Sequence, residues 1–509
     1  MGTHRTAVCR LRRPQQCSSP TCVLLASLLC LAAVRAASIG VGQAARQSRY
    51  FLLPGNPYNA KCLDGSPPAY QYRPGYGAAS QSWHIHLPGG GWCSSLEKCL
   101  ERANTKLGST RGLQRLAGGV PTGQSASRSS SRASNDNGDP DAPPRGITSP
   151  DAATNPVFHN WHLVRPVYCD GGGFAGRAGY RAAANGSAGA GVHLDGWRVI
   201  HAILADLRAN RGMTAPARIV LSGSSAGGQA VVTLCDLMPL LFPRALVKCI
   251  MDAGLFVDAE DRTNRRAFAA MVRATVGLHQ MRINWQCSQA IPPPNQWRCF
   301  FPHQALRHVA SPVLVVNSLF DYRALMLGNQ LPANQARATA CLQQIAREGG
   351  TDLLKSIKTQ RWRQEPSALA EIQTGGVLTG GGYRGGDLGN RLTSTVEEGD
   401  SPGSGAGRRK EAKGAAGGSG EKGMRGTGGV EAAAARSVCD PAEHRAVLNV
   451  AWQMIQYTDA AHLELGPTVS TFVTPAIAHC ALTSPKWDSL TDKGVTLRDA
   501  VTRWYRRPL

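Results

Sequence analysis

The chain has 509 residues, and 42% of them are hydrophobic, which is enough apolar material for one large core. No C-x-x-C pair occurs among its 15 cysteines, and this argues against zinc ribbons and thioredoxin-like chemistry. The formal net charge of +22 favours an anionic partner or surface.

The first 36 residues have the three parts of a secretory signal peptide. A basic start is followed by an apolar stretch at residues 22–34 and by a small-residue cleavage site before Ala37. The apolar stretch is short for a membrane span, and no later segment reaches about 18 uninterrupted apolar residues. We therefore expect a secreted protein that acts outside the cell or in the cell wall, without stable membrane insertion. An uncleaved anchor is the alternative.

Removing the five arginines of this leader leaves a charge of about +17 on the rest of the chain. An acidic polysaccharide is the natural anionic partner outside a cell, whereas nucleic acid suits a secreted protein poorly. We expect the first and not the second. The alternative is a solvated basic surface with no special partner.

Eleven cysteines remain outside the leader, and a secreted protein is expected to use them in disulfides. Cys93 and Cys99 are close enough in sequence to form a local bridge. The other pairings stay open, because spacing alone does not determine them. The odd number leaves at least one cysteine for a free thiol or a bond outside the chain.

The first predicted elements surround a glycine triplet. Residues 49–80 are rich in Pro, Gly and Tyr, which predicts an irregular, disulfide-tied entry segment. Residues 82–87 alternate polar and apolar side chains, as a strand does. They lead into Pro88 and the glycines at 89–91, whose backbone N–H groups could approach a ligand closely. A flexible turn is the competing interpretation.

Two stretches lack the large apolar residues that a core needs. Residues 117–144 are rich in Gly, Ser, Asn and Asp, and residues 364–438 are dominated by Gly, Ala, Ser and mixed charge. Both predict disordered insertions. We also expect glycosylation at Asn185, which begins an Asn-Gly-Ser sequon.

The remaining elements alternate between strand and helix, which predicts a mostly parallel sheet with helices on both faces. A helix is expected at residues 192–209, with Val192 on its apolar face. The predicted strands that follow occupy residues 219–221, 247–254, 312–317 and 468–474. One further helix is predicted at residues 446–457.

The stretch that organises the chain is G-x-S-x-G at residues 223–227, directly after the apolar run at 219–221. A strand, a sharp turn and a helix would expose Ser225 at the top of the sheet as a nucleophile. Ala226 then begins the helix, and its free N–H could point at an oxyanion. An ordinary Gly/Ser loop is the alternative.

A serine nucleophile needs an imidazole to accept its proton and a carboxylate to orient that imidazole. Asp321 follows the strand at 312–317 and is the candidate acid; Asp252 also ends an apolar run and is its rival. His479 follows the last predicted strand and is the candidate base. His462 competes with it but precedes that strand.

Several blocks resemble the plant-type pectin acetylesterase family, which is related to the animal Notum carboxylesterases. The blocks, in the family's order, are residues 62–66, 87–93, 160–161, 168–171, 223–228, 252–254, 317 with 321, and 478–480. The resemblance implies an α/β-hydrolase fold, with Ser225 as nucleophile, Asp321 as acid and His479 as base. The oxyanion-hole N–H groups that it implies are those of Gly90, Gly91 and Ala226.

Two positions depart from the family pattern. Pro88 stands where family members commonly have Glu, which affects the geometry of the glycine loop. Ser224 stands where plant members have Cys, which affects a disulfide or packing and not the proton relay.

Together these observations predict one α/β-hydrolase domain at residues 37–509, expected to be a monomer without cofactor or metal. Its predicted reaction is removal of acetyl groups from pectin through an acetyl-enzyme. One alternative is removal of a longer acyl chain from a protein, as in the Notum carboxylesterases. Another is a catalytically silent carbohydrate-binding relative.

Overall fold

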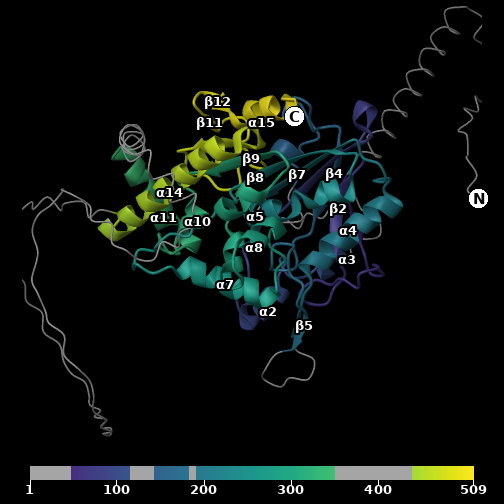
Figure 1. The fold of residues 1–509 in the computed structure, drawn as a ribbon, viewed down its shortest axis with the longest axis horizontal. Helices are drawn as coiled ribbons and strands as arrows, with labels where there is room; N and C mark the ends of the chain where they lie inside the picture. The colour runs from purple at the N-terminus through teal and green to yellow at the C-terminus, as the bar shows by residue number, and fades with distance from the viewer. Residues whose placement is uncertain (1–47, 115–142, 183–190, 350–437, 509) are drawn as a thin grey trace, which may run out of the picture. The chain divides into compact units, whose positions relative to one another are not determined.

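The computed structural model describes residues 48–114, 143–182, 191–349 and 438–508 (Figure 1). All of these residues belong to one compact unit. The predicted leader and the sequon at Asn185 lie outside the described residues. So do the two predicted insertions, apart from residues 143, 144 and 438.

The core of the fold is an eight-stranded sheet. β2 is antiparallel to both of its neighbours, and all the other pairings are parallel, as the sequence predicts. The strands, in their order across the sheet, are β1 (Arg49–Leu52), β2 (Ala69–Arg73), β4 (His162–Pro166), β3 (Ser82–Leu87), β7 (Arg218–Ser224), β8 (Leu246–Asp252), β9 (Val313–Ser318) and β10 (Val469–Thr474).

The central strands are buried on both faces, which explains their continuous apolar sequences. Successive side chains point to opposite faces, so each strand contributes to two cores. Val220 and Leu314 belong to one hydrophobic cluster, whereas Ile219, Leu221 and Val315 belong to the other.

Helices cover both faces of the sheet (Figure 1). In α15 (Leu497–Arg506) the buried residues Leu497, Val501 and Trp504 recur at helical spacing and pack on the first core. Helices that contribute buried residues to the second core include α4 (Gly196–Asn210), α5 (Ala226–Leu234), α11 (Gln335–Arg347) and α14 (Pro441–Leu465).

None of the helices in the described part of the chain is long and apolar enough to cross a membrane.

The remaining described elements connect the parts of this frame. These elements are α2 (Leu96–Ala103), α3 (Arg111–Gln114), β5 (Gly179–Ala182), β6 (Gly191–Leu194), α6 (Leu237–Leu241), α7 (Ala267–His279), α8 (Trp285–Ala290), α9 (Pro302–Ala305), α10 (Tyr322–Leu327), β11 (Thr491–Asp492) and β12 (Val495–Thr496), with 3-10 turns η1 (Gly77–Ala79), η2 (Gly146–Thr148), η3 (Pro293–Phe300), η4 (Leu306–His308) and η5 (Gly466–Thr468).

Two predicted elements need correction. The entry segment at 49–80 is not irregular throughout, because β1 and β2 lie in it and pair with each other. The helix predicted from residue 192 begins at Gly196 instead. Val192 belongs to β6, which pairs with β5, and is buried there as a strand residue.

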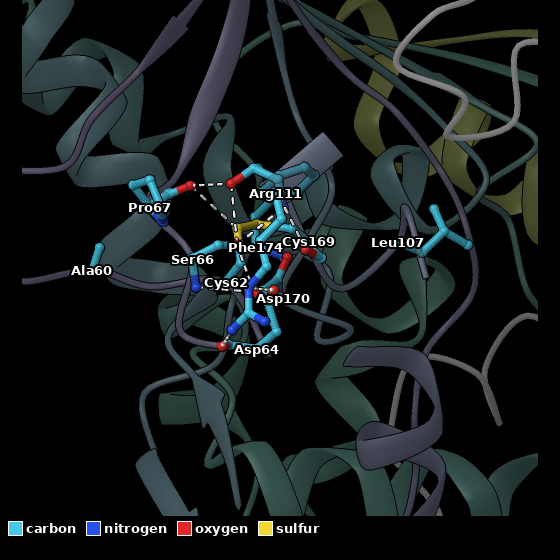
Figure 2. The surroundings of a disulfide bond; sticks show 12 residues. Ala60, Cys62, Asp64, Ser66, Pro67, Leu107, Arg111, Cys169, Asp170 and Phe174 are labelled. Carbon is cyan, nitrogen blue, oxygen red and sulfur yellow. Dashed lines mark hydrogen bonds and ion pairs between the residues drawn. A yellow bond between two sulfur atoms is a disulfide. The ribbon is translucent and has the colours of Figure 1, made fainter. Parts of the chain in front are cut away.

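Five disulfides among the described residues hold the loops around the sheet. The predicted local bridge Cys93–Cys99 is confirmed, and Cys480 is a buried thiol. Figure 2 shows the Cys62–Cys169 bond, which ties the entry segment to the loop after β4. The remaining three bonds are Cys235–Cys249, Cys287–Cys299 and Cys341–Cys439.

Candidate active site

Ser225 lies at the turn between β7 and α5. Its φ of 58° and ψ of −122° are rare for a residue with a side chain, and such strain costs about 1–3 kcal/mol. The turn is held because the Ser225 N–H donates to the Asp252 carbonyl at 2.8 Å. A Cβ on Gly227 would lie 2.1 Å from the Leu87 carbonyl oxygen, so only glycine fits behind the turn.

Asp321 and His479 meet although 158 positions separate them. Asp321 caps α10, where its Oδ1 accepts hydrogen bonds from the N–H groups of Arg323 and Ala324. Its Oδ2 lies 2.7 Å from His479 Nδ1. Both side chains are buried, and this contact leaves Nε2 as the ring nitrogen that can exchange a proton.

Adjacent parallel strands bring these groups to one edge of the sheet. β7, β8, β9 and β10 are neighbours, and Ser225, Asp321 and His479 follow the ends of β7, β9 and β10. This edge is where the carboxyl ends of parallel strands place functional side chains. The structure joins Asp321 to His479, but no hydrogen bond among the described residues joins Ser225 to His479.

Asp252, the rival acid, has different partners. Its carboxylate accepts hydrogen bonds from Ser224 Oγ at 2.8 Å, from the Ala481 N–H at 3.1 Å and from the Leu482 N–H at 3.0 Å. Burial raises the pKa of this carboxyl to about 6, although the three hydrogen bonds oppose the rise. Asp321, not Asp252, is therefore the acid in contact with the imidazole.

His462, the rival candidate for the base, belongs to α14, which precedes β10. The side chain of this residue is outside the described part of the structure. His479 is the histidine that the structure places against a carboxylate at the sheet edge.

The glycine loop after β3 lies directly against the serine turn. A Cβ on Gly89 would lie 2.6 Å from both Ser225 Cβ and the Ser224 carbonyl oxygen. Gly90 and Gly91 have φ values of 148° and 67°. The Tyr168 hydroxyl anchors the loop, because it donates to the Gly91 carbonyl at 2.6 Å. Sequence reasoning singled out Gly90 and Gly91 but missed the contact of Gly89 with the serine.

Aromatic side chains also adjoin the loop. The ring of Trp92 packs edge-on against Phe256 and Phe300, each with ring centroids 5.1 Å apart. Gln229 Nε2, on the helix that starts at the serine turn, donates to the Phe300 carbonyl at 2.9 Å. These residues come from four separate parts of the chain. Only their closeness in sequence to the glycine loop and to residues 252–254 could have drawn attention to Trp92 and Phe256.

Two clusters have the residue types of metal sites. In each of them, the two sulfur atoms belong to a disulfide, so neither sulfur is a thiolate that could bind a metal. The clusters in the described residues are Cys93 with Cys99 and His279, and Cys341 with Cys439 and Glu443.

The fold is that of the α/β-hydrolases. A solved structure described as the Wnt deacylase Notum from Drosophila superimposes with a TM-score of 0.54 at 17% identity, covering 90% of this chain and 93% of that one. The family is more specific. A model described as pectinacetylesterase matches residues 43–120 and 120–365, and the chain belongs to this pectin acetylesterase family.

Curated relatives include pectin acetylesterase 7 of Arabidopsis thaliana, 32% identical over 265 residues, or 52% of this chain and 59% of the relative. The palmitoleoyl-protein carboxylesterase NOTUM of Schmidtea mediterranea is 25% identical over 319 residues, or 60% of this chain and 55% of the relative. The matches therefore span less than two thirds of these relatives. Ser225 and Asp321 lie within the family match, whereas His479 lies beyond its end.

Proposed function

We propose that this protein is a secreted serine carboxylesterase that hydrolyses O-acetyl esters of an acidic cell-wall polysaccharide, pectin. The observation that carries the proposal is the 2.7 Å contact between Asp321 and His479 at the edge where Ser225 occupies a strained turn. Family membership supports the ester chemistry. Secretion is supported by the leader-like sequence and by five disulfides.

In the proposed reaction, His479 Nε2 takes the proton of the Ser225 hydroxyl while its oxygen attacks the ester carbonyl carbon. Asp321 holds the Nδ1 proton and stabilises the imidazolium. The resulting oxyanion would accept hydrogen bonds from the N–H groups of Gly90, Gly91 and Ala226. Collapse then breaks the bond to the sugar oxygen, which leaves with the proton from His479.

Water completes the cycle. His479 removes a proton from the water while the water oxygen attacks the acetyl-enzyme, and the proton returns to Ser225 as acetate leaves. The first step requires Ser225 Oγ and His479 Nε2 to be within hydrogen-bond distance. Such catalytic hydrogen bonds often tighten only when substrate binds.

The names of the curated relatives favour a short acyl group, because several of them are pectin acetylesterases. The ring of Trp92, directly after the glycine loop, packs against Phe256 and Phe300. The charge of +22 favours a polyuronate as the bearer of the ester. Removal of a longer acyl chain from a protein is the second candidate, because relatives include enzymes named palmitoleoyl-protein carboxylesterases.

Hydrolysis of a chromogenic acetyl ester by the wild type and by Ser225→Ala tests the chemistry. We expect loss of nearly all turnover in the variant, and equal rates would reject Ser225 as nucleophile. The acyl preference is tested by comparing acetyl with octanoyl esters. Acetate release from acetylated pectin and from acetylated xylan tests the polymer, and faster release from xylan would overturn the pectin assignment.

A further inference from the structure

The carboxylate of Asp252 connects the two loops that carry the proposed nucleophile and base. On one side it accepts from Ser224 Oγ, one residue before Ser225. On the other side it accepts from the N–H groups of Ala481 and Leu482, two and three residues after His479. No other side chain in the described residues makes hydrogen bonds to both segments.

We propose that ionised Asp252 is a positioning residue, which sets the distance between the Ser225 turn and the His479 loop and must be charged for activity. The inference rests on the proposed function. The reason is geometric: all three groups facing the carboxylate donate a proton, and only an ionised carboxylate is purely an acceptor. Hydrogen bonds to a charged acceptor are also about twice as strong as neutral ones.

The surroundings of Asp252 make its charge sensitive to pH. The side chain is only 1% exposed, and burial raises its pKa to about 6, within the range where an esterase can be assayed. The titratable group whose charge affects the pKa of Asp252 is His479, in the loop after β10; it lowers this pKa. Asp321, after β9, faces that same imidazole, and Ser224 on β7 does not titrate.

Protonation of Asp252 should therefore inactivate the enzyme as the pH falls. With a neutral chromogenic acetyl ester, the acid limb of log(kcat/KM) against pH should be steeper in the wild type, by a slope of about one, than in a variant that lacks this carboxylate. A purely structural Asp252 would leave the slope the same with and without the carboxylate.

Ser224→Ala is the main test. It removes a hydrogen bond that favours the ionised carboxylate, so the acid limb should move to higher pH by about one unit while the alkaline side is unchanged. Ser222→Ala is the matched control. Ser222 is a buried serine on the same strand, but its Oγ lies 2.7 Å from His84 Nε2 and 2.8 Å from His86 Nδ1.

These two control partners do not titrate in the assay range. Burial lowers the pKa of His84 to about 3 and also lowers the pKa of His86. The Ser222→Ala limb should therefore coincide with that of the wild type. Identical limbs for Ser224→Ala and Ser222→Ala would overturn the role of Asp252.

Asp252→Asn gives a second readout. It should lower kcat by roughly 10²-fold, as a displacement of catalytic groups does, and reduce the slope of the acid limb by about one. A slope that stays the same contradicts the proposal. If Asp252→Asn does not fold, the shift of the acid limb in Ser224→Ala relative to Ser222→Ala still tests the proposal. Absence of turnover in the wild type would instead refute the proposed function itself.

Discussion

At the scale of single residues, the site depends on very close backbone approaches. Ser225 is held in a strained turn, and the loop after β3 passes so near to it that only a hydrogen fits at Gly89. One carboxylate oxygen of Asp321 caps α10, and the other contacts His479. These contacts fix both the carboxylate and the imidazole. The positions of the reactive atoms therefore follow from contacts that individual substitutions can remove.

Gly89→Ala should impair catalysis much more than folding. Its Cβ would meet Ser225 Cβ and the Ser224 carbonyl oxygen at 2.6 Å, so the loop or the serine turn must shift. A displacement of about 1 Å at a catalytic group costs roughly 10²-fold in kcat. Gly277→Ala is the control, because no atom outside its own helix turn lies within 4 Å of the position its methyl group would take. Equal kcat values in steady-state assays of the two variants would argue against the contact.

Asp170, in the loop after β4, makes the second prediction at this scale. Burial raises the pKa of its carboxyl to about 6, above the value of 3.8 expected in the unfolded chain. The native state thus binds more protons than the unfolded state between these values, so this group lowers the free energy of unfolding as the pH rises from about 4 to 6.

Asp170→Asn should remove that contribution. Its amide oxygen can still accept from the N–H groups of Gly172 and Phe174, as the carboxylate does at 2.9 and 3.0 Å. The change in unfolding free energy between about pH 4 and 6 should become more positive than in the wild type by roughly 2 kcal/mol. Denaturant titrations at both pH values measure it, and an unchanged difference would contradict the raised pKa.

At the scale of elements, α15 shows how one helix contributes to the core. It begins at the Thr496 cap, whose Oγ1 accepts from the Asp499 N–H at 3.1 Å. Its buried side chains cover the face of the sheet opposite α5, where Trp504 is 5% exposed. The sheet that positions Ser225, Asp321 and His479 is therefore covered on one face by a helix near the end of the described residues.

Trp504→Ala should destabilise the fold by about 3–5 kcal/mol, because it removes a large buried ring and leaves a cavity. Arg503→Ala, an exposed position on the same helix, should change the stability by about 0.5 kcal/mol or less. Denaturant midpoints with the disulfides intact would compare the two. Similar midpoints would show that α15 is not packed on the sheet.

The elements that could be predicted from the sequence are those with strong local signals. β3, β7 and β9 have alternating or continuous apolar runs, and the turn at Ser225 has a motif of five residues. β1 and β2 were missed because they lie among prolines and glycines. The Cys62–Cys169 bond joins residues 107 positions apart, and the choice between Asp321 and Asp252 depends on hydrogen bonds, so local patterns could determine neither.

At the scale of the whole molecule, the net positive charge supports the proposed polyanionic substrate. The sequence carries 56 Lys and Arg against 34 Asp and Glu. A basic surface attracts a polyanion over the range of the Debye length, about 8–10 Å at physiological salt.

The salt dependence of the reaction should therefore differ between substrates. For acetylated pectin, KM should rise severalfold when the ionic strength increases from about 0.01 M to 0.15 M, because salt screens the attraction. For a small neutral acetyl ester, KM should stay nearly constant. Initial rates at several salt concentrations measure both. A KM for pectin that does not respond to salt would contradict a role for the positive charge in substrate binding.

The central claim is that Ser225 is a nucleophile activated by the pair of Asp321 and His479. Mass spectrometry of the intact protein after treatment with a fluorophosphonate, followed by peptide mapping, tests it most directly. The account predicts one adduct, located on Ser225, whose formation slows by about 10³-fold or more in Asp321→Asn. An unlabelled Ser225 in the folded wild-type protein, or equally fast labelling in Asp321→Asn, would contradict it.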